Sequence, residues 1–72
     1  MAITVKAEMA GVVETIEVEE GQGVTPETEV VILSSMKMEI PVLAGTSGRL
    51  TEILVGEGDA VKVGSALFTI EP

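Results

Sequence analysis

An eight-residue stretch, Gly11-Val12-Val13-Glu14-Thr15-Ile16-Glu17-Val18, has a counterpart 37 residues later in the chain, Gly48-Arg49-Leu50-Thr51-Glu52-Ile53-Leu54-Val55. Both copies begin with glycine and place apolar residues at their third, sixth and eighth positions. A half-buried strand alternates with a period of two, so the step from the third to the sixth position shifts the apolar face. A shift at the same place in both copies predicts a β-bulge or a strong twist in each.

The repetition extends without a gap over residues 2–35 and 39–72. Nine of the thirty-four aligned pairs are identical, where chance would give only a few. Other pairs keep their apolar character: Val13 with Leu50, Val30 with Leu67, Val31 with Phe68 and Leu33 with Ile70. We therefore expect one domain over residues 1–72, built from two equivalent halves.

Each half resembles a set of short strands separated by turns. Runs rich in Val, Ile and Thr favour strands over helices, and Gly21-Gln22-Gly23 and Gly56-Glu57-Gly58-Asp59 are typical of tight turns. We expect about eight strands and no helix. Two equivalent sets of strands around one core predict an all-β, flattened antiparallel barrel or sandwich with an approximate two-fold axis, a barrel-sandwich hybrid. The lone aromatic residue, Phe68, is expected in that core.

Composition excludes several classes of function. Cys and His are absent, which removes disulfides, thiolate and imidazole metal ligands, and Ser-His or Cys-His nucleophile pairs. We therefore expect no catalytic residues and no metal site. A net charge of −8 with one aromatic residue disfavours nucleic acid and anionic membranes as partners. No apolar run approaches the roughly 20 residues of a membrane span, and the N-terminus does not resemble a signal peptide. We expect a soluble, cytoplasmic protein.

A group of glutamates raises the question of a cation site. Its members are Glu17, Glu19, Glu20, Glu27 and Glu29. They lack the Asp-x-Asp-x-Asp-Gly spacing of an EF-hand calcium loop. We interpret them as a solvated strand face.

Between the two copies lies Ser34-Ser35-Met36-Lys37-Met38-Glu39. The two-fold axis places this connection at one end of the barrel and both termini at the other. Lys37 offers a primary amine on a long flexible stem, which suits covalent attachment through an amide bond. In most β proteins, Met36 and Met38 would be ordinary core residues beside a solvated lysine. The position of Lys37 at the centre of a duplication favours the attachment reading.

Met36-Lys37-Met38 at the centre of a duplicated β domain resembles the attachment site of the biotinyl domains in biotin-dependent carboxylases and decarboxylases. Gly48–Val55 resembles the family's Gly-x-Val-x-x-Ile-x-Val strand, and Glu57–Gly64 resembles its Glu-Gly-Asp-x-Val-x-x-Gly turn. The resemblance covers essentially the whole chain and includes the stand-alone biotin/lipoyl attachment proteins. Ser34-Ser35 stand where the family usually has Glu-Ala. The gapless repeat leaves no room for the protruding thumb insertion of some biotinyl domains.

The resemblance implies a carrier domain rather than an enzyme, with Lys37 as the residue that binds biotin covalently. It implies that biotin protein ligase reads Met36 and Met38, and that biotin carries CO₂ from a biotin carboxylase to a carboxyltransferase. A second hypothesis is a lipoyl carrier, or an acceptor of both groups, loaded on Lys37 by a lipoate ligase. Lipoyl domains usually have Asp-Lys-Ala with Glu three residues before the Lys, so Met36, Met38 and Ser34 favour biotin. A third hypothesis is an unmodified β module for protein interaction.

Overall fold

The computed structural model describes residues 1–72 and contains eight strands and no helix. The strands are β1 (Ile3–Lys6), β2 (Gly11–Ile16), β3 (Gly23–Val24), β4 (Glu29–Ser35), β5 (Met38–Leu43), β6 (Gly48–Ile53), β7 (Ala60–Val61) and β8 (Ala66–Glu71). All pairings are antiparallel and form two four-stranded sheets, in the orders β1-β8-β6-β3 and β5-β4-β2-β7. The predicted all-β architecture of two sheets is confirmed. There is accordingly no helix that could cross a membrane.

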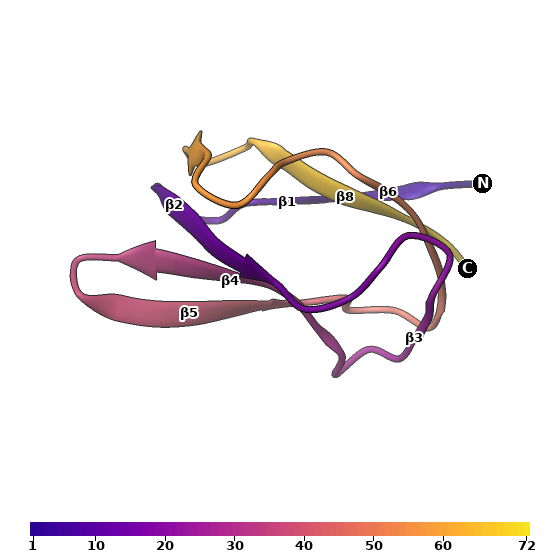
Figure 1. Cartoon of the computed structure of the whole chain (residues 1–72). Helices are drawn as coiled ribbons and strands as arrows, with labels where there is room; N and C mark the ends of the chain where they lie inside the picture. Colours follow the sequence, from indigo (N-terminus) through magenta and orange to yellow (C-terminus); the bar gives the residue numbers. More distant parts are fainter.

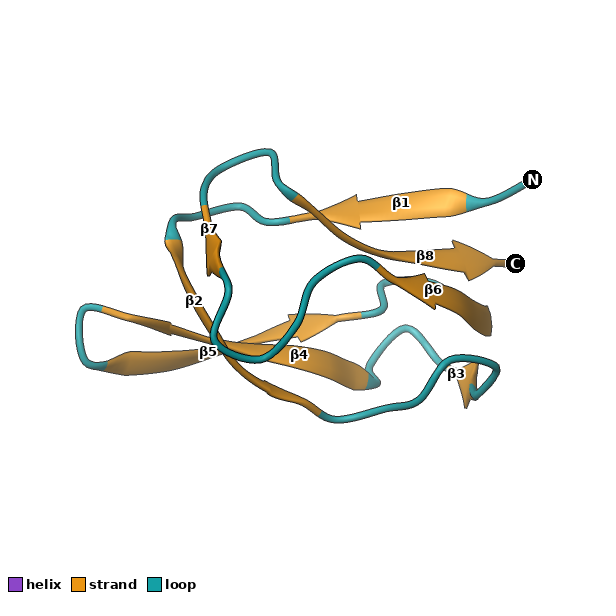
Figure 2. Cartoon of the chain, turned by 45° about the horizontal axis from the view of Figure 1, so that its top comes forward, coloured by secondary structure: helices purple, strands orange, loops and turns teal.

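The molecule is elongated, with principal extents of 32 × 18 × 17 Å. The chain termini lie together at one end, and the hairpin of β4 and β5 forms the other end (Figure 1). The second view shows the same separation (Figure 2). The predicted placement of the central connection opposite the termini is therefore confirmed.

The strands follow the repeat closely. β2 and β6 begin and end 37 residues apart, and so do β3 and β7. The pairing register shifts between Val13 and Thr15 in one copy and between Leu50 and Glu52 in the other. Irregularities of the type predicted from the apolar spacing are thus present in both copies. The longest connections, 17–22 and 54–59, have six residues each, so no thumb-like segment protrudes.

The core is built from matched positions of the two copies. All thirteen buried residues are apolar, and no buried polar side chain lacks a partner. Twelve of them form six repeat pairs: Ala7/Ala44, Val13/Leu50, Val24/Val61, Val30/Leu67, Val31/Phe68 and Leu33/Ile70. The thirteenth, Val18, has its counterpart in the half-buried Val55. Phe68 is fully buried, as predicted.

Gly11 and Gly48 mark the places where neighbouring backbones approach most closely. A Cβ atom at Gly11 would lie 2.7 Å from the carbonyl oxygen of Ser34. A Cβ atom at Gly48 would collide with the carbonyl oxygen of Glu71, the residue that corresponds to Ser34 in the other copy. Only glycine permits this approach, so β2 and β6 each begin with one.

The turn of each half packs on the long strand of the other. The amide of Gly21 donates to the carbonyl of Leu50, and the amide of Gly58 donates to the carbonyl of Val13. Carboxylates extend the same exchange: Glu20 accepts from the Ile53 amide at 2.8 Å. Its repeat partner Glu57 makes the equivalent contact in the first half.

The glutamates are solvated as predicted, but the prediction that they form a strand face is wrong. β2 ends at Ile16, so Glu17, Glu19 and Glu20 lie in a connection, and only Glu29 of the group belongs to a strand. All five are exposed, but Glu20 satisfies a backbone amide of the other half. The sequence signal that could have indicated this role is the identity of Glu20-Gly21 and Glu57-Gly58 in the repeat.

Candidate functional site

The hairpin of β4 and β5 turns through two residues. Ser35 pairs with Met38, and Ser34 pairs with Glu39, so Met36 and Lys37 alone make the connection. Their φ angles are 50° and 67°. Positive φ at both central residues is the property of type I′ turns, which match the twist of the two strands. Asn-Gly is the usual choice there; a Met-Lys turn holds two ordinary side chains in the left-handed region at a cost of roughly 1–2 kcal/mol each.

Met36 and Lys37 are the only non-glycine residues of the chain with positive φ. Strained backbone of this kind concentrates at functional sites, where the surrounding structure holds it in place. Here the ladder between β4 and β5 holds the turn. The strain therefore points to this tip as the functional end of the molecule.

The Lys37 side chain is exposed and free of internal partners. Its amine takes part in no hydrogen bond and no ion pair. The one salt bridge of the molecule joins the Met1 amino group and Glu71 at 2.7 Å, at the opposite end. An amine without partners, on a turn that projects beyond the sheets, can be surrounded by another protein without unfolding the barrel.

The two methionines beside it do not belong to the core. Met36 is 91% exposed and Met38 is 58% exposed, so the reading of both as ordinary core residues does not hold. Ser34 and Ser35 at the base of the turn are half-buried. The site therefore presents a primary amine between two flexible apolar side chains, on a protein with a net charge of −8.

A pair of carboxyl groups lies on the outer face of this sheet. Glu39 of β5 raises the pKa of Glu14 in β2, first through a side-chain hydrogen bond between them and then through charge repulsion. Glu17 and Glu29 line the same shallow groove of about 360 Å³. No three acidic side chains are placed so that they could hold a metal ion.

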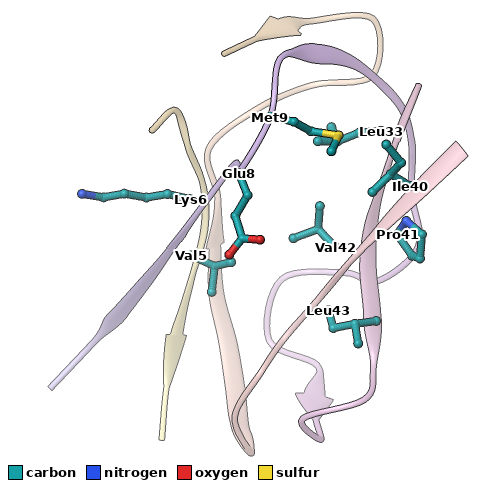
Figure 3. Close-up of a pocket in the computed structure, with 9 residues that line it drawn as sticks. All are labelled: Val5, Lys6, Glu8, Met9, Leu33, Ile40, Pro41, Val42 and Leu43. Atoms are coloured by element: carbon teal, nitrogen blue, oxygen red, sulfur yellow. The ribbon is translucent and has the colours of Figure 1, made fainter. Parts of the chain in front are cut away.

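A second cavity, of about 320 Å³, opens between the edge strands β1 and β5 (Figure 3). Its lining residues are Val5, Lys6, Glu8, Met9, Leu33, Ile40, Pro41, Val42 and Leu43. Lys6 extends away from the apolar side chains, and it forms no ion pair with Glu8. The cavity thus offers no pair of groups for acid-base or nucleophilic chemistry.

Comparison with known proteins places the chain in a family. The family described as "Biotin-requiring enzyme", which comprises biotin and lipoyl attachment domains, matches residues 4–70. The chain belongs to this biotin/lipoyl domain family.

Two relatives match this biotin/lipoyl domain over nearly their whole length. The biotinylated protein TB7.3 homolog of Mycobacterium leprae is 40% identical over 70 residues, which cover 97% of this chain and 99% of the relative. The biotin/lipoyl attachment protein of Bacillus subtilis is 41% identical over 68 residues, which cover 94% and 93%.

Solved structures show the same fold within larger proteins and alone. The urea carboxylase of Kluyveromyces lactis matches 99% of this chain with a TM-score of 0.93 and 30% identity, over 6% of its own length. The lipoyl domain of the 2-oxoglutarate dehydrogenase complex from Azotobacter vinelandii matches 97% with a TM-score of 0.81 and 29% identity, over 96% of its own length. The expected resemblance to biotinyl and lipoyl domains is confirmed.

Proposed function

We propose that this biotin/lipoyl domain is a biotin carboxyl carrier and that Lys37 is its attachment residue. The observation that carries the proposal is the free amine of Lys37 on a strained two-residue turn at the end opposite the termini. The names of its relatives support biotin as the attached group.

The other two lysines, Lys6 and Lys62, are also exposed but lie elsewhere in the fold. Lys6 lies in β1 beside the cavity between the sheet edges. Lys62 lies in the β7–β8 connection, where its backbone amide donates to the Ser65 hydroxyl. Neither stands at the tip of a hairpin that a ligase could enclose. Position rather than exposure therefore singles out Lys37.

Attachment joins Lys37 Nζ to the carboxyl carbon of biotin. Biotin protein ligase first joins the biotin carboxylate to AMP from ATP, with release of pyrophosphate. The amine then attacks the carboxyl carbon, the bond to AMP breaks, AMP leaves, and the nitrogen gives up a proton as the amide bond forms. Met36 and Met38 flank the amine with flexible thioether side chains, which adapt readily to an apolar protein surface. We propose that these two side chains are the contacts that the ligase reads.

Bound biotin supplies a ureido nitrogen that accepts and donates a carboxyl group; the domain supplies position and reach. The rigid β4–β5 ladder holds the tether at the tip, and attachment keeps the group at high local concentration near its partners. The proposed partners are a biotin carboxylase and a carboxyltransferase. Support comes from homologous domains within carboxylases, such as the urea carboxylase of Kluyveromyces lactis.

Lipoate is the second candidate for the same amine. It is favoured by the name of the Bacillus subtilis relative, a biotin/lipoyl attachment protein, and by the similarity to a lipoyl domain. Both groups attach through an amide bond to a lysine, so the geometry of the hairpin suits either. The apolar neighbours Met36 and Met38 support biotin as the first choice.

The test is attachment itself. The unmodified chain is incubated with purified biotin protein ligase, ATP and biotin, and the intact mass is measured. We expect one increment of biotin on the wild-type chain and on Lys62→Arg, and none on Lys37→Arg. Persistent labelling of Lys37→Arg would refute the assignment, and an increment obtained solely with a lipoate ligase would replace biotin by lipoate.

A further inference from the structure

A shallow groove lies at the base of the hairpin, next to the proposed attachment residue. It has a volume of about 600 Å³ and is widely open to solvent. Its lining residues are Met9, Ala10, Gly11, Ser34, Ser35, Met36, Met38 and Ile40. We call it the hairpin groove.

The groove exists because the hairpin projects beyond the opposite sheet (Figure 1). Directly paired residues share one face of a sheet. Val31 and Val42 are such a pair, and on the same face follow Leu33 with Ile40 and then Ser35 with Met38. Toward the tip this inner face loses its facing strands, and only the β1–β2 connection with Met9 lies across it. Figure 3 shows the Met9 side chain directed toward Leu33 and Ile40.

The chemistry of the lining is narrow. Three thioethers and the Ile40 side chain make it apolar, and none of its residues is charged, although 22% of the chain is. Ser35 adds a hydroxyl on the inner face, and that hydroxyl makes no hydrogen bond within the molecule. Such a lining fits an uncharged, largely apolar ring with a polar edge. It offers no charged side chain to bind an ionic ligand.

The two copies of the repeat differ in polarity at two positions of this lining. The places of Met9 and Ala10 are taken in the other copy by Thr46 and Ser47. At that end the chain termini stand where the hairpin would be, with the Met1–Glu71 ion pair beside them. Two positions of the lining are therefore apolar beside Lys37 and polar at the other end, whereas Met38 and Ile40 have the apolar counterparts Met1 and Ile3.

We propose that the hairpin groove is a resting site for the ring system of biotin carried by Lys37, an inference that rests on the proposed function. The fused rings pack on Met9, Met36 and Met38, and the ureido group exchanges a hydrogen bond with the Ser35 hydroxyl. The lysine stem and the pentanoyl chain form a flexible tether, so the ring meets the groove at a millimolar effective concentration. Weak contacts therefore suffice to hold the ring between visits to partner sites, and a partner can remove it easily.

The first measurement uses the fully biotinylated chain with ¹³C-labelled methionine methyl groups. Met9 is distant from Lys37 in sequence, so nuclear Overhauser contacts between its methyl group and biotin ring protons report docking. We expect these contacts in the wild type. We expect Ser35→Ala to lower the ratio of docked to free ring by about fivefold, the worth of one neutral hydrogen bond. Ser47→Ala is the matched control, because Ser47 is an exposed serine that does not line the groove.

A second variant tests the apolar wall without the labelled residue. Met9→Thr introduces the residue that the other copy carries at this place. We expect the ureido groups of ¹⁵N-biotin on this variant to relax as a freely moving tether, whereas on the wild type they relax with the barrel. Equal mobility in both proteins, or an absence of Met9 contacts in the wild type, would overturn the resting site.

The outcomes separate this inference from the proposed function. Intact mass establishes biotinylation of every sample before the spectra are recorded, so a loaded protein without contacts refutes the groove alone. A wild-type chain that the ligase does not load refutes both proposals. A mixture of labelled unmodified chain with unlabelled biotinylated chain shows whether the ring binds the groove of its own molecule or that of a second copy. Contacts in that mixture would assign the ring to a neighbouring molecule and overturn the tethered arrangement.

Discussion

The carboxylate of Glu57 accepts a hydrogen bond from the backbone amide of Ile16, 3.0 Å away. Glu20 makes the equivalent contact to Ile53 in the other half. Each acidic side chain thus satisfies an amide just at the end of a long strand, β2 or β6, across the boundary between the two halves.

These contacts predict a measurable loss of stability. Glu20→Ala and Glu57→Ala should each lower the free energy of unfolding by about 1 kcal/mol, the value of a typical hydrogen bond in proteins. Urea denaturation followed by circular dichroism measures it. Glu19→Ala is the control, since that side chain makes no hydrogen bond. If Glu19→Ala lowered the free energy of unfolding as much as Glu20→Ala, the loss would come from the removed charge and not from the hydrogen bond.

The turn at Met36 and Lys37 should be improvable as structure. Met36→Gly relieves one left-handed side chain and should raise the free energy of unfolding by about 1 kcal/mol. Met38→Gly, in the adjoining strand, should lower it. The urea midpoints of the two variants measure these changes. A Met36→Gly protein that is less stable than the wild type would show that the turn is not strained.

Recognition by the ligase should depend on the polarity of the flanking residues. Met36→Asp should reduce the rate of biotinylation strongly, because an unpaired carboxylate is costly to bury in an apolar pocket. Met38→Leu keeps size and polarity and should reduce it little. A time course of intact mass with purified biotin protein ligase gives both rates. Wild-type rates for Met36→Asp would remove the methionines from the recognition site.

A triple variant tests the choice between the two attached groups. Ser34→Glu with Met36→Asp and Met38→Ala introduces the residues usual in lipoyl domains. In competition between purified biotin and lipoate ligases, we expect lipoylation to rise relative to biotinylation. An unchanged product ratio in the mass spectrum would place the discrimination outside the hairpin.

Phe68 should be the most costly side chain to truncate. It is fully buried, and Phe→Ala in a core costs about 3–5 kcal/mol, a large part of the stability of so small a domain. We expect Phe68→Ala to be largely unfolded at 37 °C by circular dichroism. Leu54→Ala, at a position 45% exposed, should remain folded and lose about 1 kcal/mol or less. A folded Phe68→Ala protein with a wild-type midpoint would contradict this view of the core.

The Glu14–Glu39 pair predicts a pH dependence. Because Glu39 raises the pKa of Glu14 above its ordinary 4.5, the folded chain binds that proton more tightly than the unfolded chain. Below the ordinary pKa the protonated Glu14 does not oppose folding. As the pH rises through the raised pKa, Glu14 ionises beside Glu39, and the free energy of unfolding falls. Glu14→Gln should raise the urea midpoint at about pH 7 and leave it unchanged at about pH 3. A gain of equal size at both values would exclude the ionised pair as its cause.

Much of the fold could be predicted because the repeat carries the information twice. The shift of apolar spacing at Glu14 and Thr51 indicated both register breaks, and the apolar pairs of the repeat proved to be the core. The contacts of Glu20 and Glu57 escaped prediction because exposed glutamates in solvent and glutamates bound to a distant amide look alike in sequence. The cavity between β1 and β5 and the hairpin groove were also missed, since both depend on how far one strand projects beyond another.

Each sheet contains two strands from each half: β1 and β3 join β6 and β8, while β5 and β7 join β2 and β4. A peptide with the sequence of one half would therefore lack half the partners of its strands. Two copies of that peptide would complete each other about a true two-fold axis, as intertwined homodimers do. The present chain is what a fusion of two such subunits produces. The junction of that fusion is Met36-Lys37, so a covalent site there exists once per assembly, whereas a symmetric dimer would carry any site twice.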